Sequence, residues 1–141
     1  MTWEDVTVPA VGCSAGEAAH VRFSAGDVCV VEVRIGDDLY VQGEAHDLFE
    51  ALALARRELE AHGVLLALNG SRTNVFPSPM LRQGARGRYA YELAMPRSVT
   101  KPPTVDIFAP VPESSALASV EDQRAWFDEW LRSKPVEGAL S

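Results

Sequence analysis

The sequence has few of the residues from which small proteins build covalent or metal-bound frameworks. It contains two cysteines and three histidines in 141 residues. A disulfide framework needs more cysteines than this, and a structural zinc site needs four clustered nitrogen or sulfur ligands, a spacing that is absent here. We therefore predict no metal and no cofactor. Cys29 alternates into an apolar strand, so we expect it to pack as a small hydrophobic residue.

Long apolar runs are also lacking. The longest strongly apolar run covers residues 64–68, far short of the ~20 residues that cross a bilayer. The N-terminus carries Glu4 and Asp5, where a secretory leader needs a basic region followed by an apolar one. These features predict a cytoplasmic protein with no membrane contact, and the length suits a single domain over residues 1–141.

No catalytic signature is present. The chain contains neither a Gly-x-Ser-x-Gly motif nor the glycine pattern and Lys-Ser/Thr pair of a phosphate-binding loop. His20, His46 and His62 fall at an expected strand start, helix entry and helix end. The sequence thus identifies no catalytic residue and favours a non-enzymatic role over an enzymatic one.

Acidic residues are absent from residues 61–91, although they dominate elsewhere. Between Gly70 and Lys101 there are six cations and one anion, Glu92, a net charge of +5, while the rest of the chain carries −12 and the whole chain −7. An overall acidic chain is a poor binder of nucleic acid, because phosphate affinity comes from Lys and Arg. A local basic patch remains compatible with an acidic partner or a small anion.

The acid-free window also holds the densest motif, at residues 69–83. A turn after a buried strand can direct backbone N–H groups outward to bind an anion, and arginines add forked donors. The candidate partner-binding or ligand-binding residues are Asn69, Gly70, Ser71, Arg72, Ser78, Arg82, Arg86 and Arg88. The structural alternative is that these arginines are solvated strand and loop edges, or that Glu92 pairs with an arginine across a sheet.

The pattern of apolar residues predicts an α+β fold. We expect strands at residues 20–23, 28–35, 39–43, 64–68, 88–95 and 104–108, and a short extended piece at residues 73–76. They form one mixed, mostly antiparallel sheet of five or six strands. Because residues 64–68 are apolar throughout, they are predicted to lie centrally, parallel to a meander strand through a right-handed crossover. Residues 1–16 are expected to form a loose arm, and residues 109–118 a linker.

Two longer helices and a short one are predicted. Asp47 and Glu50 form a capping-box pattern before a helix that ends near Gly63. Its apolar stripe is Leu48, Leu52, Ala55 and Leu59, which places Arg56 mainly on the other side. Ser78 is expected to cap a short helix starting at Pro79, and Ser119 a C-terminal helix. Trp126 and Trp130 share a face of that last helix, and we expect them to close the core rather than bind a partner.

Residues 47–108 resemble a group of small, poorly characterised bacterial proteins. The resemblance rests on an Asn-Gly-x-Arg turn, a Val-aromatic-Pro-Ser-x-Met-x-Arg segment, a tyrosine-containing strand and an Asp-Ile-Phe strand. The matching residues are Asn69, Gly70, Arg72, Val75, Phe76, Pro77, Ser78, Met80, Arg82, Tyr91, Asp106, Ile107 and Phe108. The group has no established activity, although small acidic proteins of this kind include antitoxin-like immunity proteins.

Two hypotheses of function follow. The first is a non-enzymatic recognition protein, immunity-like in character, whose basic segment at residues 69–88 binds an acidic protein or peptide. The second is a protein or enzyme that holds a small anionic ligand between Arg72, Arg82 and the backbone of residues 69–71. The ligand hypothesis needs a concave pocket with converging polar groups, whereas partner binding can use an open patch.

Overall fold

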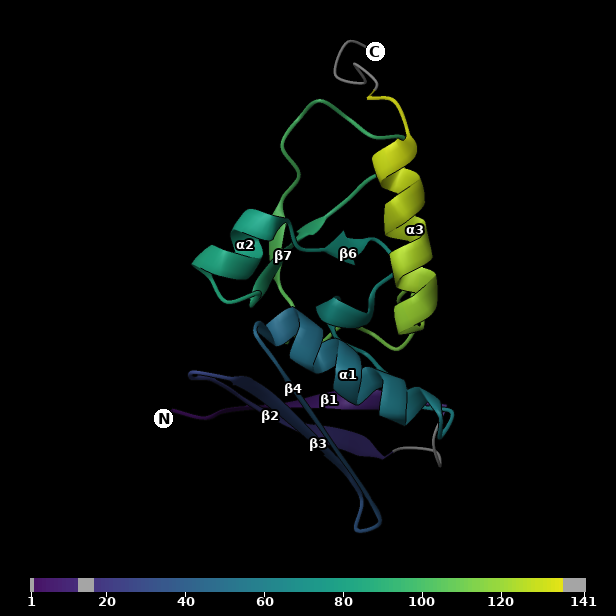
Figure 1. Ribbon diagram of the computed structural model, residues 1–141. Helices are drawn as coiled ribbons and strands as arrows, with labels where there is room; N and C mark the ends of the chain where they lie inside the picture. Colours follow the sequence, from purple (N-terminus) through teal and green to yellow (C-terminus); the bar gives the residue numbers. More distant parts are fainter. Residues whose placement is uncertain (1, 13–16, 136–141) are drawn as a thin grey trace.

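The computed structural model describes residues 2–12 and 17–135, and it confirms the α+β class. A five-stranded and a three-stranded sheet lie on opposite sides of helix α1 (Leu48–Glu60), and helix α3 (Val120–Arg132) rises beside the smaller sheet (Figure 1). Within the described residues, no helix combines the length and the apolar character needed to cross a bilayer.

The larger sheet is an antiparallel meander that has one polar face. Its strands, in spatial order, are β4 (Leu39–Ala45), β3 (Cys29–Ile35), β2 (Ala18–Ala25), β1 (Glu4–Val11) and β5 (Leu65–Leu66). In β3, Cys29, Val31, Val33 and Ile35 are buried, while Glu32 and Arg34 lie on the other face, as the alternation predicted. The buried thiol of Cys29 confirms its packing role.

Helix α1 covers the apolar face of this sheet. Its cap is the predicted one, because the Asp47 carboxylate accepts a hydrogen bond of 2.8 Å from the backbone N–H of Glu50. The helix crosses β4 at Gly43, where a Cβ atom would lie only 2.0 Å from the Ala51 carbonyl oxygen. This close approach needs glycine. Leu52 from the helix and Leu66 from β5 belong to one core, as expected.

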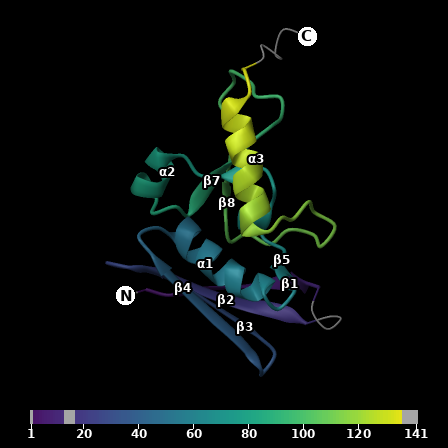
Figure 2. The ribbon, with the colours of Figure 1, turned by 45° about the vertical axis from the view of Figure 1, so that its right-hand side comes forward.

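The smaller sheet consists of β6 (Val75–Phe76), β7 (Tyr89–Glu92) and β8 (Thr104–Asp106), in that order. Helix α2 (Pro79–Gly84) follows β6, and its cap is the predicted Ser78, whose Oγ accepts from the Leu81 N–H at 3.2 Å. Helix α3 stands against this half of the molecule (Figure 2), and Ser119 caps it through the Asp122 N–H at 3.0 Å.

The predicted parallel crossover is wrong. Strand β5 pairs antiparallel with β1, Ala10 facing Leu66, and all strand pairs of the described chain are antiparallel. The chain after β5 is nevertheless flanked on both sides, since the Ala67 N–H donates to Pro9 and the Ala67 carbonyl accepts from Val111. Because neighbouring chain flanks this segment on both sides, the apolar sequence of residues 64–68 resembles that of a central strand.

Two segments expected to be loose are bound to the fold. Residues 4–11 are β1, an interior strand whose Val8 and Ala10 are buried; residues 1 and 13–16 of the predicted arm lie outside the described residues. The predicted linker at residues 109–118 is held by backbone hydrogen bonds, including those from Thr73 to Ala116 and from Ala118 to Ser71. In β1, the apolar residues Val6, Val8 and Ala10 occupy alternate positions and so lie on one face of the strand, which is the face toward the core.

Candidate functional site

The turn at residues 69–71 is buried and does not present an anion cradle. It forms a short 3₁₀ helix, η1 (Asn69–Ser71), in which Gly70 and Ser71 are inaccessible to solvent. The three backbone N–H groups donate to the carbonyl oxygens of Ala109, Ile107 and Leu68 at 2.9–3.0 Å. No N–H of this turn is left for a ligand, so the prediction that residues 69–71 bind an anion through their backbone is wrong.

This turn is instead held by two buried polar side chains, Arg56 of α1 and Gln123 of α3, which we call the Arg56–Gln123 cluster. Arg56 is 2% and Gln123 1% exposed. The guanidinium donates to the carbonyl oxygens of Gly70 and Ala118 and to Oε1 of Gln123, each at 2.8 Å. Burial lowers the pKa of Arg56 to about 10, against a smaller opposing effect of Glu60. The cluster joins both long helices to η1.

The placement of Arg56 corrects the sequence prediction. The helical pattern predicts Arg56 on the solvent side of α1. The residue instead lies four residues after Leu52 and extends the same buried stripe. Gln123 donates through Nε2 to the carbonyls of Gly70, Arg72 and Val75 at 2.8–3.0 Å. The hydrogen bonds that Arg56 and Gln123 donate here all end on oxygen atoms of the protein itself. The two side chains therefore have a structural role.

Most arginines of the acid-free window are neutralised by carboxylates. Arg72 pairs with Glu92 at 2.6 Å, the cross-sheet pairing that the structural alternative named. Arg82 pairs with Asp47 at 3.0 Å. Both acids lie outside residues 61–91, so the basic net charge of that stretch of sequence does not become an open basic surface.

Arg88 is similarly engaged. It forms ion pairs with Glu4 and with Asp106, the latter at 3.2 Å. Burial alone would lower the pKa of Arg88, but the hydrogen bonds that it donates to the carboxylates of Glu4 and Asp106 outweigh this effect and raise the pKa. Arg86 makes no ion pair with another described residue, and donates to the His46 carbonyl at 3.2 Å. The eight candidate residues therefore do not converge on one ligand site.

An apolar groove of about 340 Å³, which we call the aromatic groove, opens between the smaller sheet and α3. Its walls are Phe76, Pro77, Ser78 and Pro79 after β6, Tyr91 and Leu93 of the β7 segment, Lys101 and Pro102 of the following loop, and Phe127, Trp130 and Leu131 of α3. Of the predicted site residues, Ser78 alone lines it. Trp130 is half-buried and packs on the core as expected, but it also forms part of this wall.

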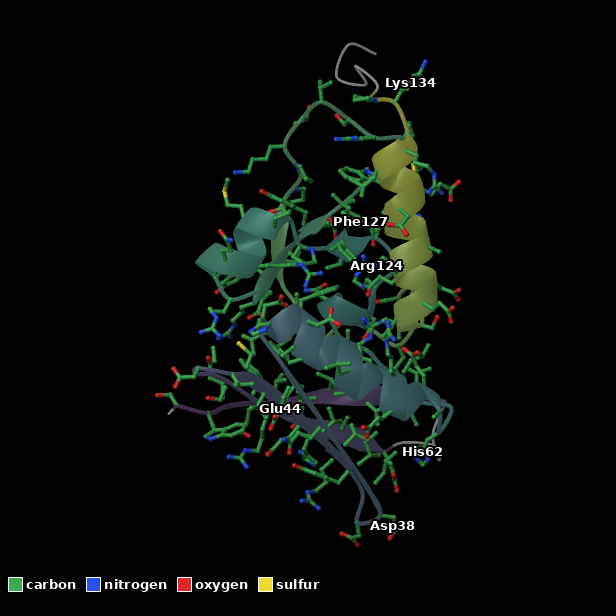
Figure 3. The ribbon with its side chains drawn as sticks, in the orientation of Figure 1. Asp38, Glu44, His62, Arg124, Phe127 and Lys134 are labelled. Atoms are coloured by element: carbon green, nitrogen blue, oxygen red, sulfur yellow. The ribbon has the colours of Figure 1, made fainter. Side chains whose placement is uncertain are left out.

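Stacked rings form the floor of the aromatic groove. Phe76 and Phe127 lie with ring centroids 4.0 Å apart and an interplanar angle of 12°, and Phe127 and Trp130 follow at 5.8 Å and 15°. Phe127 and Arg124 extend from α3 on the side that faces β6 (Figure 3). A second hollow of about 370 Å³ shares Leu93, Lys101, Pro102 and Trp130 with the groove, and the loop at residues 97–103 lines it.

Three cations surround these rings without a carboxylate partner. Arg124 lies 5.3 Å above the ring centre of Phe76, and Arg97 lies 4.6 Å above that of Trp130. Lys101 lines both hollows. None of the three makes an ion pair with another residue in the described part of the chain. Three cations without an ion pair thus lie close to the rings of the aromatic groove, although Arg34, Arg57, Arg86, Arg132 and Lys134 also make no ion pair with a described residue.

Metal chemistry finds no support in the arrangement of ligands. Across residues 2–12 and 17–135, no three His, Cys, Asp or Glu side chains lie close enough to hold an ion.

Comparison with known proteins adds no assignment: no model of a protein family matches the chain, and no curated protein matches it.

Proposed function

We propose that the protein is a non-enzymatic recognition domain that binds an acidic segment of a partner protein in the aromatic groove. This proposal keeps the acidic partner of the sequence hypothesis and moves the contact surface from residues 69–88 to the groove. The observation that carries it is the set of unpaired cations, Arg97, Lys101 and Arg124, around buried and partly buried aromatic rings that line a hollow. Charge complementarity at such a rim guides encounter and selects partners.

The charges around the groove favour an anionic occupant. Arg82 also lies 5.6 Å from the Phe76 ring centre, but Asp47 neutralises it. On α3, Asp128 follows Phe127 and Glu129 precedes Trp130, while Glu92, which lines the second hollow, is paired with Arg72. The three unpaired cations outnumber these two carboxylates of α3, so an acidic segment gains net attraction and a basic one is repelled.

The apolar surface continues beyond the hollow, which favours a protein partner over a small ligand. Leu131, 48% exposed, lines the groove, and Val99, 65% exposed, lines the second hollow. Met80, 79% exposed, lies outside both hollows and follows the lining residue Pro79. A small-molecule site encloses most of its ligand, whereas exposed apolar residues around a depression are typical of protein interaction surfaces.

The test is selection from a displayed library of random peptides against the immobilised protein. We expect the enriched peptides to combine Asp or Glu with apolar residues. Their affinity should fall at least about tenfold on Leu131→Glu or Arg124→Glu, because each change places a negative charge at the groove.

Matched controls lie on α1, away from both hollows. Leu54 is an exposed leucine and Arg57 an exposed arginine, so Leu54→Glu and Arg57→Glu repeat the same chemical changes elsewhere and should leave binding unchanged. Three outcomes contradict the proposal: no enrichment, enrichment of basic peptides, or binding that all four variants retain.

A further inference from the structure

Resting on the proposed function, we infer that the groove recognises an aromatic side chain that has carboxylates on both sides of it in the partner sequence. The aromatic residue enters the groove as a side chain, and the partner backbone does not add to the smaller sheet, which forms one side of the groove. This inference names the anchor, the flanking charges and the mode of contact, which the proposed function leaves open.

The walls of the groove suit a flat anchor. Phe127 already stacks on Phe76, and Trp130 continues the series at a similar angle. The other walls contribute Tyr91 and the rigid rings of Pro77 and Pro102. Aromatic pairs gain energy beyond the area that they bury, so an aromatic anchor has an advantage here over an aliphatic one of similar size.

Strand addition is disfavoured by the same prolines. Strand β6 is one edge of the three-stranded sheet and is followed at once by Pro77; β8 is the other edge and is preceded by Pro102 and Pro103. Proline has no N–H to donate to an added strand, and sheets use it to protect edges. Recognition must therefore come from side chains.

Cations lie over two different rings of the stacked series. Arg124 belongs to α3 and lies over Phe76, while Arg97 belongs to the loop before β8 and lies over Trp130. Lys101 adds a third charge where the two hollows meet. Phe127 stands between Phe76 and Trp130 in this series, so the anchor lies in the hollow that the three rings line, with Arg97 and Lys101 from the loop and Arg124 from α3 near it. This arrangement matches carboxylates before and after the aromatic residue.

The experiment uses synthetic peptides and the Trp130 indole N–H signal in NMR spectra of the isotope-labelled protein. The indole donates to the Ala94 carbonyl at 3.1 Å, so the signal reports on the groove; a Trp130→Phe variant assigns it. Trp3, which lies under Arg22 on the meander, provides an internal control signal that should not shift.

Five peptides separate the elements of the inference. The first carries phenylalanine between aspartates. A one-sided peptide replaces the aspartates on one side only with asparagines, and the others replace the phenylalanine with leucine, all aspartates with asparagines, or all aspartates with lysines. We expect the leucine peptide to bind about threefold to tenfold more weakly and the asparagine peptide at least about tenfold more weakly. The lysine peptide should not bind the native protein, but should bind an Arg124→Glu, Lys101→Glu variant.

The outcomes distinguish the two proposals. If the leucine peptide equals the phenylalanine peptide, or if aspartates on one side suffice, the inference is overturned and the proposed function stands. If no acidic peptide shifts the Trp130 signal, whatever its anchor, the proposed function fails and the inference fails with it. Binding of the lysine peptide to the native protein also overturns both.

Discussion

Replacing Gln123 with leucine should remove a large part of the stability of the fold, although it leaves the shape of the side chain nearly unchanged. The amide of Gln123 carries two hydrogens, which the carbonyls of Gly70, Arg72 and Val75 share. Its Oε1 accepts from the charged Arg56. The two neutral bonds contribute about 1 kcal/mol each and the charge-assisted bond about 1.5–3 kcal/mol, so we expect Gln123→Leu to lower the free energy of unfolding by about 3–5 kcal/mol.

The assay is urea unfolding followed by far-ultraviolet circular dichroism. The midpoint should fall while the slope of the transition stays constant, since the native surface is little altered. Gln83 is exposed on α2 and has no side-chain hydrogen bond within the described residues, so Gln83→Leu is the matched control and should change stability by less than about 0.5 kcal/mol. A loss below about 1 kcal/mol for Gln123→Leu would refute the idea that this side chain docks α3.

Three further changes probe other parts of the fold. Arg82→Gln should cost about 1–3 kcal/mol in thermal unfolding because it leaves a nearly buried carboxylate without its charge partner; an unchanged melting temperature would favour the open basic surface instead. Gly43→Ala should destabilise the protein by more than about 2 kcal/mol, since the added methyl meets the Ala51 carbonyl of α1 at 2.0 Å, and a neutral result would mean that helix and sheet are farther apart. In a Cys13→Ser variant, Cys29 should react with a thiol reagent only as the protein unfolds, because it is buried and burial raises its pKa; rapid labelling of the folded protein would contradict this.

Helix starts were predictable because capping is a local property. Asp47, Ser78 and Ser119 each bond a backbone N–H three residues later, as their spacing indicated. The strands of the meander were predictable for the same reason, because the alternation of apolar and polar residues along a strand is also a local pattern. Strand partners were less accessible to prediction: that β5 pairs antiparallel with β1 depends on how the chain returns after α1, which no pattern within residues 64–68 encodes.

The surroundings of the candidate site residues were not predictable for a related reason. The net charge of a stretch of sequence does not include the charges that distant segments bring close to it in the fold. The carboxylate partners of Arg82 and Arg88 lie 35 and 84 residues away in the sequence. The aromatic groove draws its walls from four separate segments, so no motif could reveal it. One signal was available: Gln123 lies three residues after Val120 and four before Phe127, within the apolar stripe of the last helix, where a lone polar residue indicates a buried hydrogen-bonding role.

The Arg56–Gln123 cluster has a consequence for the order of events during synthesis. The carbonyls of Gly70, Arg72 and Val75 leave the ribosome well before Gln123 does, and until α3 emerges they have only water in place of its amide. The same helix supplies Phe127, Trp130 and Leu131 to the groove. A nascent chain can form the meander and α1 early, but the groove is complete only when α3 docks. Under the proposed function, a partner would therefore bind only chains in which α3 has folded onto the smaller sheet.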